Sequence, residues 1–390
     1  MKIAILNNWD GLMHFFHRYI DHDQHEVWYV CDEKGEKGVR TFLGAEHQTR
    51  QVRIDKLDDE RAVIEALRGL RDRVAFERIV AVDEFTVLPA ARARDALGIP
   101  GPGALQVECY RDKRRMKEVL AAAGIRVIRD LSPATIMDAF VPCVVKALHG
   151  AAAMGVHVCR TRAELEPRLE ALAGGALLEE YVEGDFFHVD GAFDPDGVVA
   201  MPHAYVNDCY AHYVTRTPLG SIGVDDEVLR GRLVELAGRV VRALPLPTGV
   251  FHLEVIRTPD DQLVFLEIAC RLGGGEIYQN FIDTYGLDLL GFHIAAELGA
   301  GPALTPLRRG DVAGWLMLNN FPHIPGVFTG LSARPLRPDT CAYGVRCPKL
   351  GRPIGPFDYV SFSLRGRSSD VVRAGIDDLI ANVRLHSEAP

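Results

Sequence analysis

The chain has 390 residues, of which 48% are hydrophobic and 25% are charged, and its formal net charge at pH 7 is −9. This length and hydrophobic content are ample for a sizeable core divided over two or three domains. The acidic balance argues against a nucleic-acid-binding protein, and the apolar runs are too short to span a membrane. A binding site for a small anion is still compatible with the negative net charge, because a local basic site can lie in an acidic protein.

The first hundred residues alternate between strands and helices, which predicts a Rossmann-like α/β domain with a parallel sheet over residues 1–100. Strands are expected at 2–7, 25–31 and 76–82, and helices at 60–70 and 88–98. The start reads as a strand and not as a signal peptide. Eight cysteines without CxxC pairs predict reduced thiols in a cytoplasmic protein. The break "GIPGPG" (98–103) is taken as the domain boundary.

The second region, residues 101–309, begins with a helix that Gly124 ends. Further strands are expected at 143–148, 156–159, 176–182, two within 185–201, 250–257 and 263–270, with helices near 226–243 and 280–298. Thr161 and Glu164 form a capping box, and Pro167 is expected to kink or delay the helix that follows. The third region, 310–390, is rich in Pro, Gly and Arg and ends in a helix over about 370–385.

One hydrophobic run, "FLEIACRLGGG" (265–275), contains a glutamate. If the two strands around "TPDDQ" form a hairpin centred between Asp260 and Asp261, Glu254 lies opposite Glu267 and both point to one face. Two carboxylates in direct register repel each other. A divalent cation with oxygen ligands, such as Mg²⁺, explains the arrangement. The alternative is a register shifted by one or two residues, with one glutamate simply solvated.

The residues after Glu267 are suited to an anion. Arg271 presents a planar fork that fits phosphate or carboxylate. Gly273, Gly274 and Gly275 allow close approach of a ligand and offer backbone N–H groups. Carboxylates, an arginine and a loop of glycines together indicate a Mg-nucleotide site that meets an anionic substrate.

Five segments of the chain, in this order, are similar to those of the ATP-grasp superfamily: "RDKRRMKEVLAAAGI", "VVKALHGAAAMGV", "LLEEYVEGDFFHVDG", "FHLEVI" and "FLEIACRLGGG". More narrowly, the chain resembles the carboxylate–amine ligase branch, which includes L-amino acid ligases and biotin-carboxylase-like enzymes. The resemblance covers roughly residues 100–310. It implies a multidomain α/β and α+β chain, in which an N-terminal parallel-sheet domain precedes an ATP-grasp fold with a C-terminal lid subdomain.

The resemblance implies that two lysines contact the phosphates of ATP. Lys113 matches the first, although a charge at a basic helix start is the simpler reading of it. Lys146 matches the second and counts as catalytic; a lysine buried in an apolar strand without an anion would be costly. The segment "HGAAAMG" (149–155), with Gly150 and Gly155, matches the loop that covers the phosphates, and a plain hairpin turn is its alternative.

The nucleotide base and ribose are assigned by the same resemblance. Glu179 matches an adenine contact, and the backbone of Glu180, Tyr181 and Val182 matches the hinge beside the base. Asp185 matches the ribose-binding acid across a one-residue gap. The alternative is that these acids are solvated surface charges.

The metal and transfer roles follow in the same way. Glu254 and Glu267 match the ligands of Mg²⁺, for which Mn²⁺ is a possible substitute. Arg271 matches the catalytic arginine that meets the transferred phosphoryl group, beside glycines 273–275 on the substrate side. Many family members carry an asparagine ligand where this chain has Ala269, so the number of metal ions is not set by the sequence.

The acceptor side is expected near His252, His212 and Arg216, the last two in the polar and aromatic segment "NDCYAHYVTR", for which an ordinary surface loop is the alternative. The segment "NNFPHIPG" (319–326) is a candidate contact loop.

The expected activity is ADP-forming ligation of a carboxylate to an amine through an acyl phosphate, on amino acids in dipeptide or natural-product synthesis. The alternatives are another ATP-grasp reaction, such as a carboxyphosphate carboxylase or a thioester ligase, and a nucleotide-binding protein without turnover. Small-molecule carboxylates and amines are the expected partners. The resemblance also implies a homodimer, which no residue specifies.

Overall fold

The structure is a computed structural model, which describes residues 1–9, 16–42, 50–131, 142–150, 153–304, 310–319, 326–332, 341–354 and 359–388. Residues 151 and 152 of the predicted phosphate-covering loop, and 320–325 of the candidate contact loop, lie outside the described residues.

A four-stranded parallel sheet forms the N-terminal part, as predicted, with strand order β3-β2-β1-β4. Its strands are β1 (Lys2–Asn7), β2 (Glu26–Cys31), β3 (Gln51–Arg53) and β4 (Arg78–Val80), and its helical elements are η2 (Phe16–Arg18), α1 (Glu33–Phe42), α3 (Glu60–Gly69) and α4 (Val87–Leu97). Residues 3–6 of β1 are fully buried, because helices cover both faces of such a sheet. Gly98 ends α4 with φ 68°, which a glycine adopts without strain.

A small antiparallel sheet, β6-β5-β7, follows α5 (Ala104–Glu108) and α6 (Lys113–Ala122). It consists of β5 (Cys143–Lys146), β6 (His157–Cys159) and β7 (Leu177–Glu180), with α7 (Arg162–Leu165), η3 (Glu166–Arg168) and α8 (Leu169–Ala173) between the last two strands. The capping box of Thr161 and Glu164 is confirmed. Pro167 lies in η3, which breaks the helix into two short pieces, because proline lacks the N–H that a continuous helix needs.

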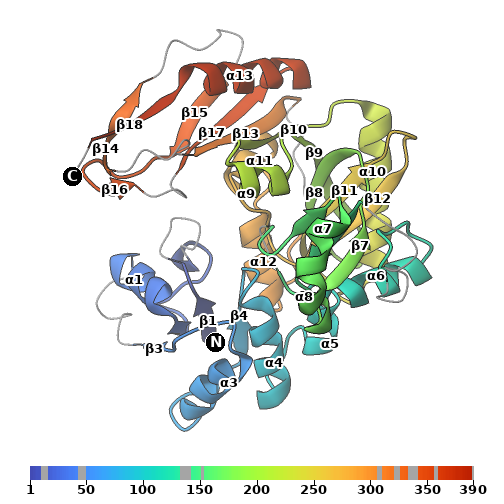
Figure 1. Ribbon diagram of the computed structural model, residues 1–390. Helices are drawn as coiled ribbons and strands as arrows, with labels where there is room; N and C mark the ends of the chain where they lie inside the picture. Colours follow the sequence, from blue (N-terminus) through green and yellow to red (C-terminus); the bar gives the residue numbers. More distant parts are fainter. Residues whose placement is uncertain are drawn as a thin grey trace.

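The largest element is an eight-stranded antiparallel sheet with the order β12-β11-β8-β9-β10-β13-β17-β15 (Figure 1). Its strands are β8 (Asp185–Phe193), β9 (Val198–Tyr205), β10 (Leu219–Gly223), β11 (Gly249–Arg257), β12 (Leu263–Ala269), β13 (Val312–Asn319), β15 (Cys341–Arg346) and β17 (Tyr359–Gly366). The sheet therefore continues past residue 310, and the domain boundary placed there stays a prediction. A third antiparallel sheet contains β14 (Gly326–Ser332), β16 (Pro353–Ile354) and β18 (Arg384–Glu388).

The helices of this half are α9 (Cys209–Thr215), α10 (Glu227–Ala243), α11 (Ile277–Tyr285), α12 (Leu289–Glu297) and α13 (Ser369–Asn382). One expectation was wrong here, and one of two alternative readings does not hold. The single helix near 280–298 is two helices, because Gly286 ends α11 in the left-handed conformation and Asp288 caps α12. The segment "NDCYAHYVTR" contains the helix α9, capped by Asp208, and is not an irregular loop.

The two faces of the large sheet differ in chemistry. On β8, Phe187, Val189 and Phe193 belong to the apolar core that also contains Leu233 and Ala237 of α10. Side chains alternate along a strand, so His188 and Asp190 point to the opposite face. That face carries the polar residues of the candidate site.

Helix α12 lies between the N-terminal sheet and the large sheet, where it packs against β4, β8 and β11 (Figure 1). Arg94 of α4 pairs there with Glu297 of α12, and both side chains are buried. The parallel N-terminal sheet and the antiparallel sheets that follow it confirm the predicted α/β and α+β fold class. All eight cysteines are free thiols. Among the helices that the structure describes, none is both long and apolar enough to cross a membrane.

Candidate active site

A β-bulge sets the register of the two predicted metal-binding glutamates. Near the turn, Val255 pairs with Phe265, but one residue further along, Glu254 pairs with Glu267, so Leu266 is the extra residue of β12. Without the bulge, Glu254 would lie opposite Leu266 and the two carboxylates would point to opposite faces. The predicted pairing of Glu254 with Glu267 is confirmed, and the bulge was not predicted.

Glu254 lies in a half-buried polar setting. Its Oε1 accepts hydrogen bonds from the Tyr205 hydroxyl at 2.9 Å and from the Cys209 thiol at 3.8 Å. His252 Nε2 lies 3.6 Å from the same oxygen. The carboxylate is therefore held in place, and its hard oxygen donors suit a cation such as Mg²⁺.

Glu267 faces a group of lysines. Its Oε2 lies 3.3 Å from Lys113 Nζ, and Lys113 also donates to the carbonyl oxygen of Gly150 at 2.7 Å. Burial raises the pKa of Glu267, but the positive charges of Lys113, Lys146 and Lys117 outweigh it and lower the pKa to about 2. Glu267 is therefore a carboxylate at neutral pH, as a metal ligand must be.

A second carboxylate, Glu179, is buried between two lysines. Lys146 Nζ lies 2.8 Å from Glu179 Oε2, and Lys117 Nζ pairs with Glu179 Oε1. Burial and the nearby charge of Lys146 lower the pKa of Lys117 to about 8, although Glu179 acts in the opposite direction. Lys113, Lys117 and Lys146 thus lie together beside the two carboxylates of Glu179 and Glu267.

The predicted hinge residues lie at the end of the small sheet. The backbone N–H groups of Glu180 and Tyr181 donate to the carbonyl oxygens of Arg129 and Pro142, and the Glu180 side chain pairs with Arg129 at 2.9 Å. Val182 packs in a small apolar cluster with Ile128, Ile256 and Val264. Asp185 is mostly exposed and pairs with Arg257 at 2.6 Å. The nucleotide roles of these residues stay predictions.

The glycine segment covers a buried hydrogen-bond chain on the large sheet. A Cβ at Gly273 would lie 2.5 Å from Asp190 Oδ1 and 2.8 Å from His252 Nδ1, so no side chain fits there. Gly275 has φ 65° and packs on Trp315, whereas Gly274 has open space beside it. The segment thus places bare backbone directly above His252.

Asp190 organises this chain. It accepts from His188 Nδ1 at 2.5 Å and from His252 Nδ1 at 2.8 Å, and Ser221 lies 2.7 Å from His188 Nε2. Burial raises the pKa of Asp190, but His252 and His188 outweigh it and hold the pKa well below the usual range. Burial lowers the pKa of His252, but Asp190 outweighs it and raises the pKa to about 9.

The ligand atoms of His188, Asp190 and His252 lie within 4.8 Å of one another, close enough for a metal ion. In this structure the same atoms hydrogen-bond to one another. These hydrogen bonds account for the arrangement of the three side chains and fix the orientation of His252 next to Glu254.

Arg271 is held by the N-terminal part of the chain. Its Nε donates to Glu84 Oε2 at 2.5 Å, and its Nη1 donates to the carbonyl oxygen of Leu272 at 2.6 Å. Arg111 pairs with the other oxygen of Glu84. The predicted catalytic arginine therefore lies in a network of three charged side chains.

The other predicted acceptor residues lie on or just after α9. His212 Nδ1 lies 2.6 Å from the carbonyl oxygen of Thr217. Arg216 caps the helix with φ 57° and stacks near the Tyr213 ring. Cys209, on the same helix, contacts Glu254, so the helix begins next to the two predicted metal-binding acids. A substrate role for His212 and Arg216 stays a prediction.

Sequence reasoning missed several residues of this site: Glu84, Arg111, Lys117, His188 and Asp190. A signal existed for Lys117, which follows Lys113 by four residues and so lies on the same face of α6. His188 and Asp190 alternate on β8 with buried apolar residues, which indicates a polar face. Glu84 and Arg111 gave no local signal.

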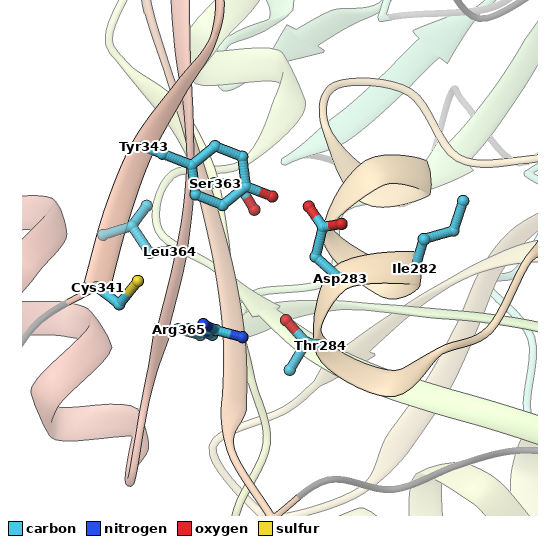
Figure 2. A pocket seen from close by; sticks show the side chains of 8 residues that line it. All are labelled: Ile282, Asp283, Thr284, Cys341, Tyr343, Ser363, Leu364 and Arg365. Atoms are coloured by element: carbon cyan, nitrogen blue, oxygen red, sulfur yellow. The ribbon is translucent and has the colours of Figure 1, made fainter.

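The structure also has a cavity of about 490 Å³ between α11 and the strands β15 and β17. Asp283 and Thr284 line it from α11, and Cys341, Tyr343, Ser363 and Arg365 line it from β15 and β17 (Figure 2). It contains none of the predicted site residues and lies outside the candidate active site.

The sequence and the fold are both similar to those of known proteins. Residues 110–275 match the family model described as ATP-grasp domain. The chain is 22% identical over 262 residues to alanine–anticapsin ligase of Bacillus subtilis (strain 168), which covers 59% of this chain and 56% of the relative. It is also 22% identical over 282 residues to the L-arginine-specific L-amino acid ligase of Bacillus subtilis, covering 65% and 68%.

The fold as a whole is similar to the crystal structure of an L-amino acid ligase from Bacillus licheniformis. The TM-score is 0.74 at 18% identity, with 99% of this chain and 98% of that chain covered. In sequence, the match spans little more than half the length of the alanine–anticapsin ligase.

The small and the large antiparallel sheets that follow the parallel sheet, with the lysines and carboxylates between them, define a protein with the ATP-grasp fold. Residues 110–275 match the ATP-grasp domain family, and the chain as a whole has the fold of the L-amino acid ligase from Bacillus licheniformis.

Proposed function

We propose that this protein is an ATP-dependent ligase that joins a carboxylate to an amine and releases ADP and phosphate. The observation that carries the proposal is the cross-strand pair of Glu254 and Glu267 facing the buried lysines 113, 117 and 146. This arrangement offers oxygen ligands for a cation beside positive charges for phosphates. The relatives named as amino-acid ligases support the same reading.

Glu254 and Glu267 fit a hard divalent cation, because both are carboxylates on one sheet face and Glu267 is partly exposed, with 33% of its side chain accessible. When bound, Mg²⁺ would neutralise charge on the β- and γ-phosphates and make the terminal phosphoryl group easier to transfer. Ala269 supplies no ligand, so two carboxylates are the residues assigned to metal.

The protein's own residues would bind and orient the reactants. Lys113 and Lys146 balance the charge of the phosphates, and Arg271 with the N–H groups of residues 273–275 stabilises charge at the transferred group, where preorganised electrostatics contribute most. The carboxylate oxygen attacks the γ-phosphorus, forming an acyl phosphate and ADP. The amine nitrogen then attacks the acyl carbon and forms the C–N bond, the bond from the acyl carbon to the phosphate oxygen breaks, and the proton that the amine loses leaves with the phosphate.

Water must be excluded during the second step, because an acyl phosphate hydrolyses. The segment 149–155 is the proposed cover, since Gly150 at its start is hydrogen-bonded to Lys113 and Gly155 near its end has φ 72°. His252, which Asp190 fixes beside the glycine segment, is the proposed contact of the acceptor.

We further propose amino acids as the substrates, which the names of the relatives support. The test is release of ADP and phosphate from Mg-ATP over a panel of amino acids, singly and in pairs, with mass spectrometry of the products. The expected result is ADP release that requires two amino acids and yields their condensed product. Tight Mg-ATP binding without turnover for any pair would contradict the amino-acid assignment and favour a nucleotide-binding role, with which Ala269 is consistent.

A further inference from the structure

Glu84 joins two arginines that come from the two ends of the ATP-grasp domain. Its Oε2 accepts from Arg271 Nε at 2.5 Å, and its Oε1 pairs with Arg111. Only 11% of the Glu84 side chain is exposed, against 8% for Arg111 and 20% for Arg271. The N-terminal part of the chain therefore supplies the central charge of this network.

The two arginines in turn hold the starts of two segments assigned to phosphates. Arg271 Nη1 donates to the carbonyl oxygen of Leu272, directly before the glycine segment, at 2.6 Å. Arg111 Nη2 donates to the carbonyl oxygen of His149, at the start of segment 149–155, at 3.1 Å. Glu84 thus connects to both segments through one arginine each.

The backbone that carries Glu84 is itself fixed. Asp83 is buried and accepts hydrogen bonds from the backbone N–H of Phe85 at 2.9 Å, the hydroxyl of Thr86 at 2.7 Å and the amide of Asn8 at 3.3 Å. These bonds close a tight turn between β4 and α4. The position of the Glu84 side chain is therefore set by the N-terminal sheet.

One guanidinium of the network keeps a free donor. Arg111 and Arg271 share the carboxylate of Glu84, and the charges of Glu267 and Asp83 also act on Arg111. A guanidinium has five N–H donors. Within the described part of the chain, Arg271 Nη2 makes no hydrogen bond, so this end of the fork is available to a ligand.

We propose that Glu84 is a positioning residue that aims Arg271 at the terminal phosphate of bound ATP, with Arg111 as the second support. The inference rests on the proposed function in that it takes ATP as the ligand of the cleft. Because ADP lacks the terminal phosphate, Glu84 then contributes to the preference for ATP over ADP and little to the affinity for ADP.

The test measures dissociation constants, with Mg²⁺ present, for ADP and for the β,γ-imido analogue of ATP, which is not hydrolysed. The variants are Glu84→Gln, Arg271→Ala and the double variant. Glu77→Gln is the matched control, because Glu77 lies before the other end of β4 and its exposed side chain accepts from the Lys2 N–H. Glu84→Asp, which keeps the charge and shortens the reach, replaces Glu84→Gln if the latter does not fold.

The expected result for Glu84→Gln is a loss of about tenfold in the preference for the triphosphate, the size of one charge-assisted contact, with the affinity for ADP changed by less than about twofold. The double variant should lose no more than Arg271→Ala alone, because both substitutions remove the same interaction. Glu77→Gln should behave like the wild type.

An unchanged preference in Glu84→Gln, or losses that add in the double variant, would overturn the inference. So would a wild-type protein that binds both nucleotides equally well. These measurements need no turnover, so absence of any ligation product would contradict the proposed function and leave this result standing.

Discussion

Glu267 is the side chain on which the account of the site depends most. Three lysines lower its pKa to about 2, and the bulge at Leu266 brings it opposite Glu254. A carboxylate kept ionised by lysines, in a strand of apolar neighbours, is hard to explain without a ligand that shares those charges. The lysines would bind phosphate and the carboxylate would bind the cation that accompanies it.

We predict that Glu267→Gln abolishes turnover and leaves the fold intact. The amide keeps the shape and loses the charge, so ATP-dependent product formation should fall by at least about 100-fold. Circular dichroism and thermal unfolding check the fold, and ADP release checks the activity. Glu118→Gln, an exposed substitution on α6, is the control, and retained ADP release in Glu267→Gln would remove Glu267 from the metal site.

At the scale of single elements, the face of β8 and β9 that carries His188 and His203 lowers the stability of the fold at acidic pH. His203 is fully buried and stacks on His188, with ring centroids 5.1 Å apart. Burial and the neighbouring His188 lower its pKa from 6.5 to about 3. Between these two values, the unfolded chain binds a proton at His203 and the folded chain does not.

The free energy of unfolding should therefore fall as the pH is lowered from about 6.5 towards 3, by about 1.4 kcal/mol per pH unit for this one group. His203→Phe keeps an aromatic ring in the stack and removes the titration. Urea unfolding at several pH values between 7 and 4 should show a shallower acid decline in His203→Phe than in the wild type. Parallel declines would show that His203 is not the responsible group.

Most elements could be predicted from the sequence, and the misses have physical reasons. β1 was predicted at its observed bounds, because its run of apolar residues is buried on both sides and sets its own ends. The prediction of one long helix near 280–298 was wrong. A single glycine is compatible with a helical pattern, but Gly286 ends helix α11. The bulge at Leu266 has no sequence signature, so the register was right at Glu254 but wrong nearer the turn.

For the whole molecule, the contacts between the N-terminal part and the rest decide how the site is assembled. Arg94 of α4 and Glu297 of α12 form a buried ion pair between them, and Arg94 also donates to the carbonyl oxygens of Ile79 and Pro102. This ion pair joins residues that are far apart in the chain. Glu84 and Arg271, separated by 187 positions, form a second pair of this kind, and no local sequence pattern predicts such pairs.

We predict that Glu297→Ala lowers the free energy of unfolding by about 3 kcal/mol, because it leaves the Arg94 charge buried without a partner. The double variant Arg94→Met, Glu297→Leu removes both charges and should recover much of that loss. Denaturant unfolding of the three proteins measures both effects. A single variant as stable as the wild type would show that the pair does not hold the two parts together.

The central claim, transfer of the ATP terminal phosphoryl group to a substrate carboxylate, is tested most directly by isotope transfer. The protein is incubated with Mg-ATP and a mixture of amino acids whose carboxylates carry ¹⁸O, and the released phosphate is analysed by mass spectrometry. We predict one ¹⁸O atom in each phosphate, because the attacking carboxylate oxygen leaves with the phosphorus. Unlabelled phosphate released together with ADP would mean that water or another acceptor receives the phosphoryl group, and would contradict the account.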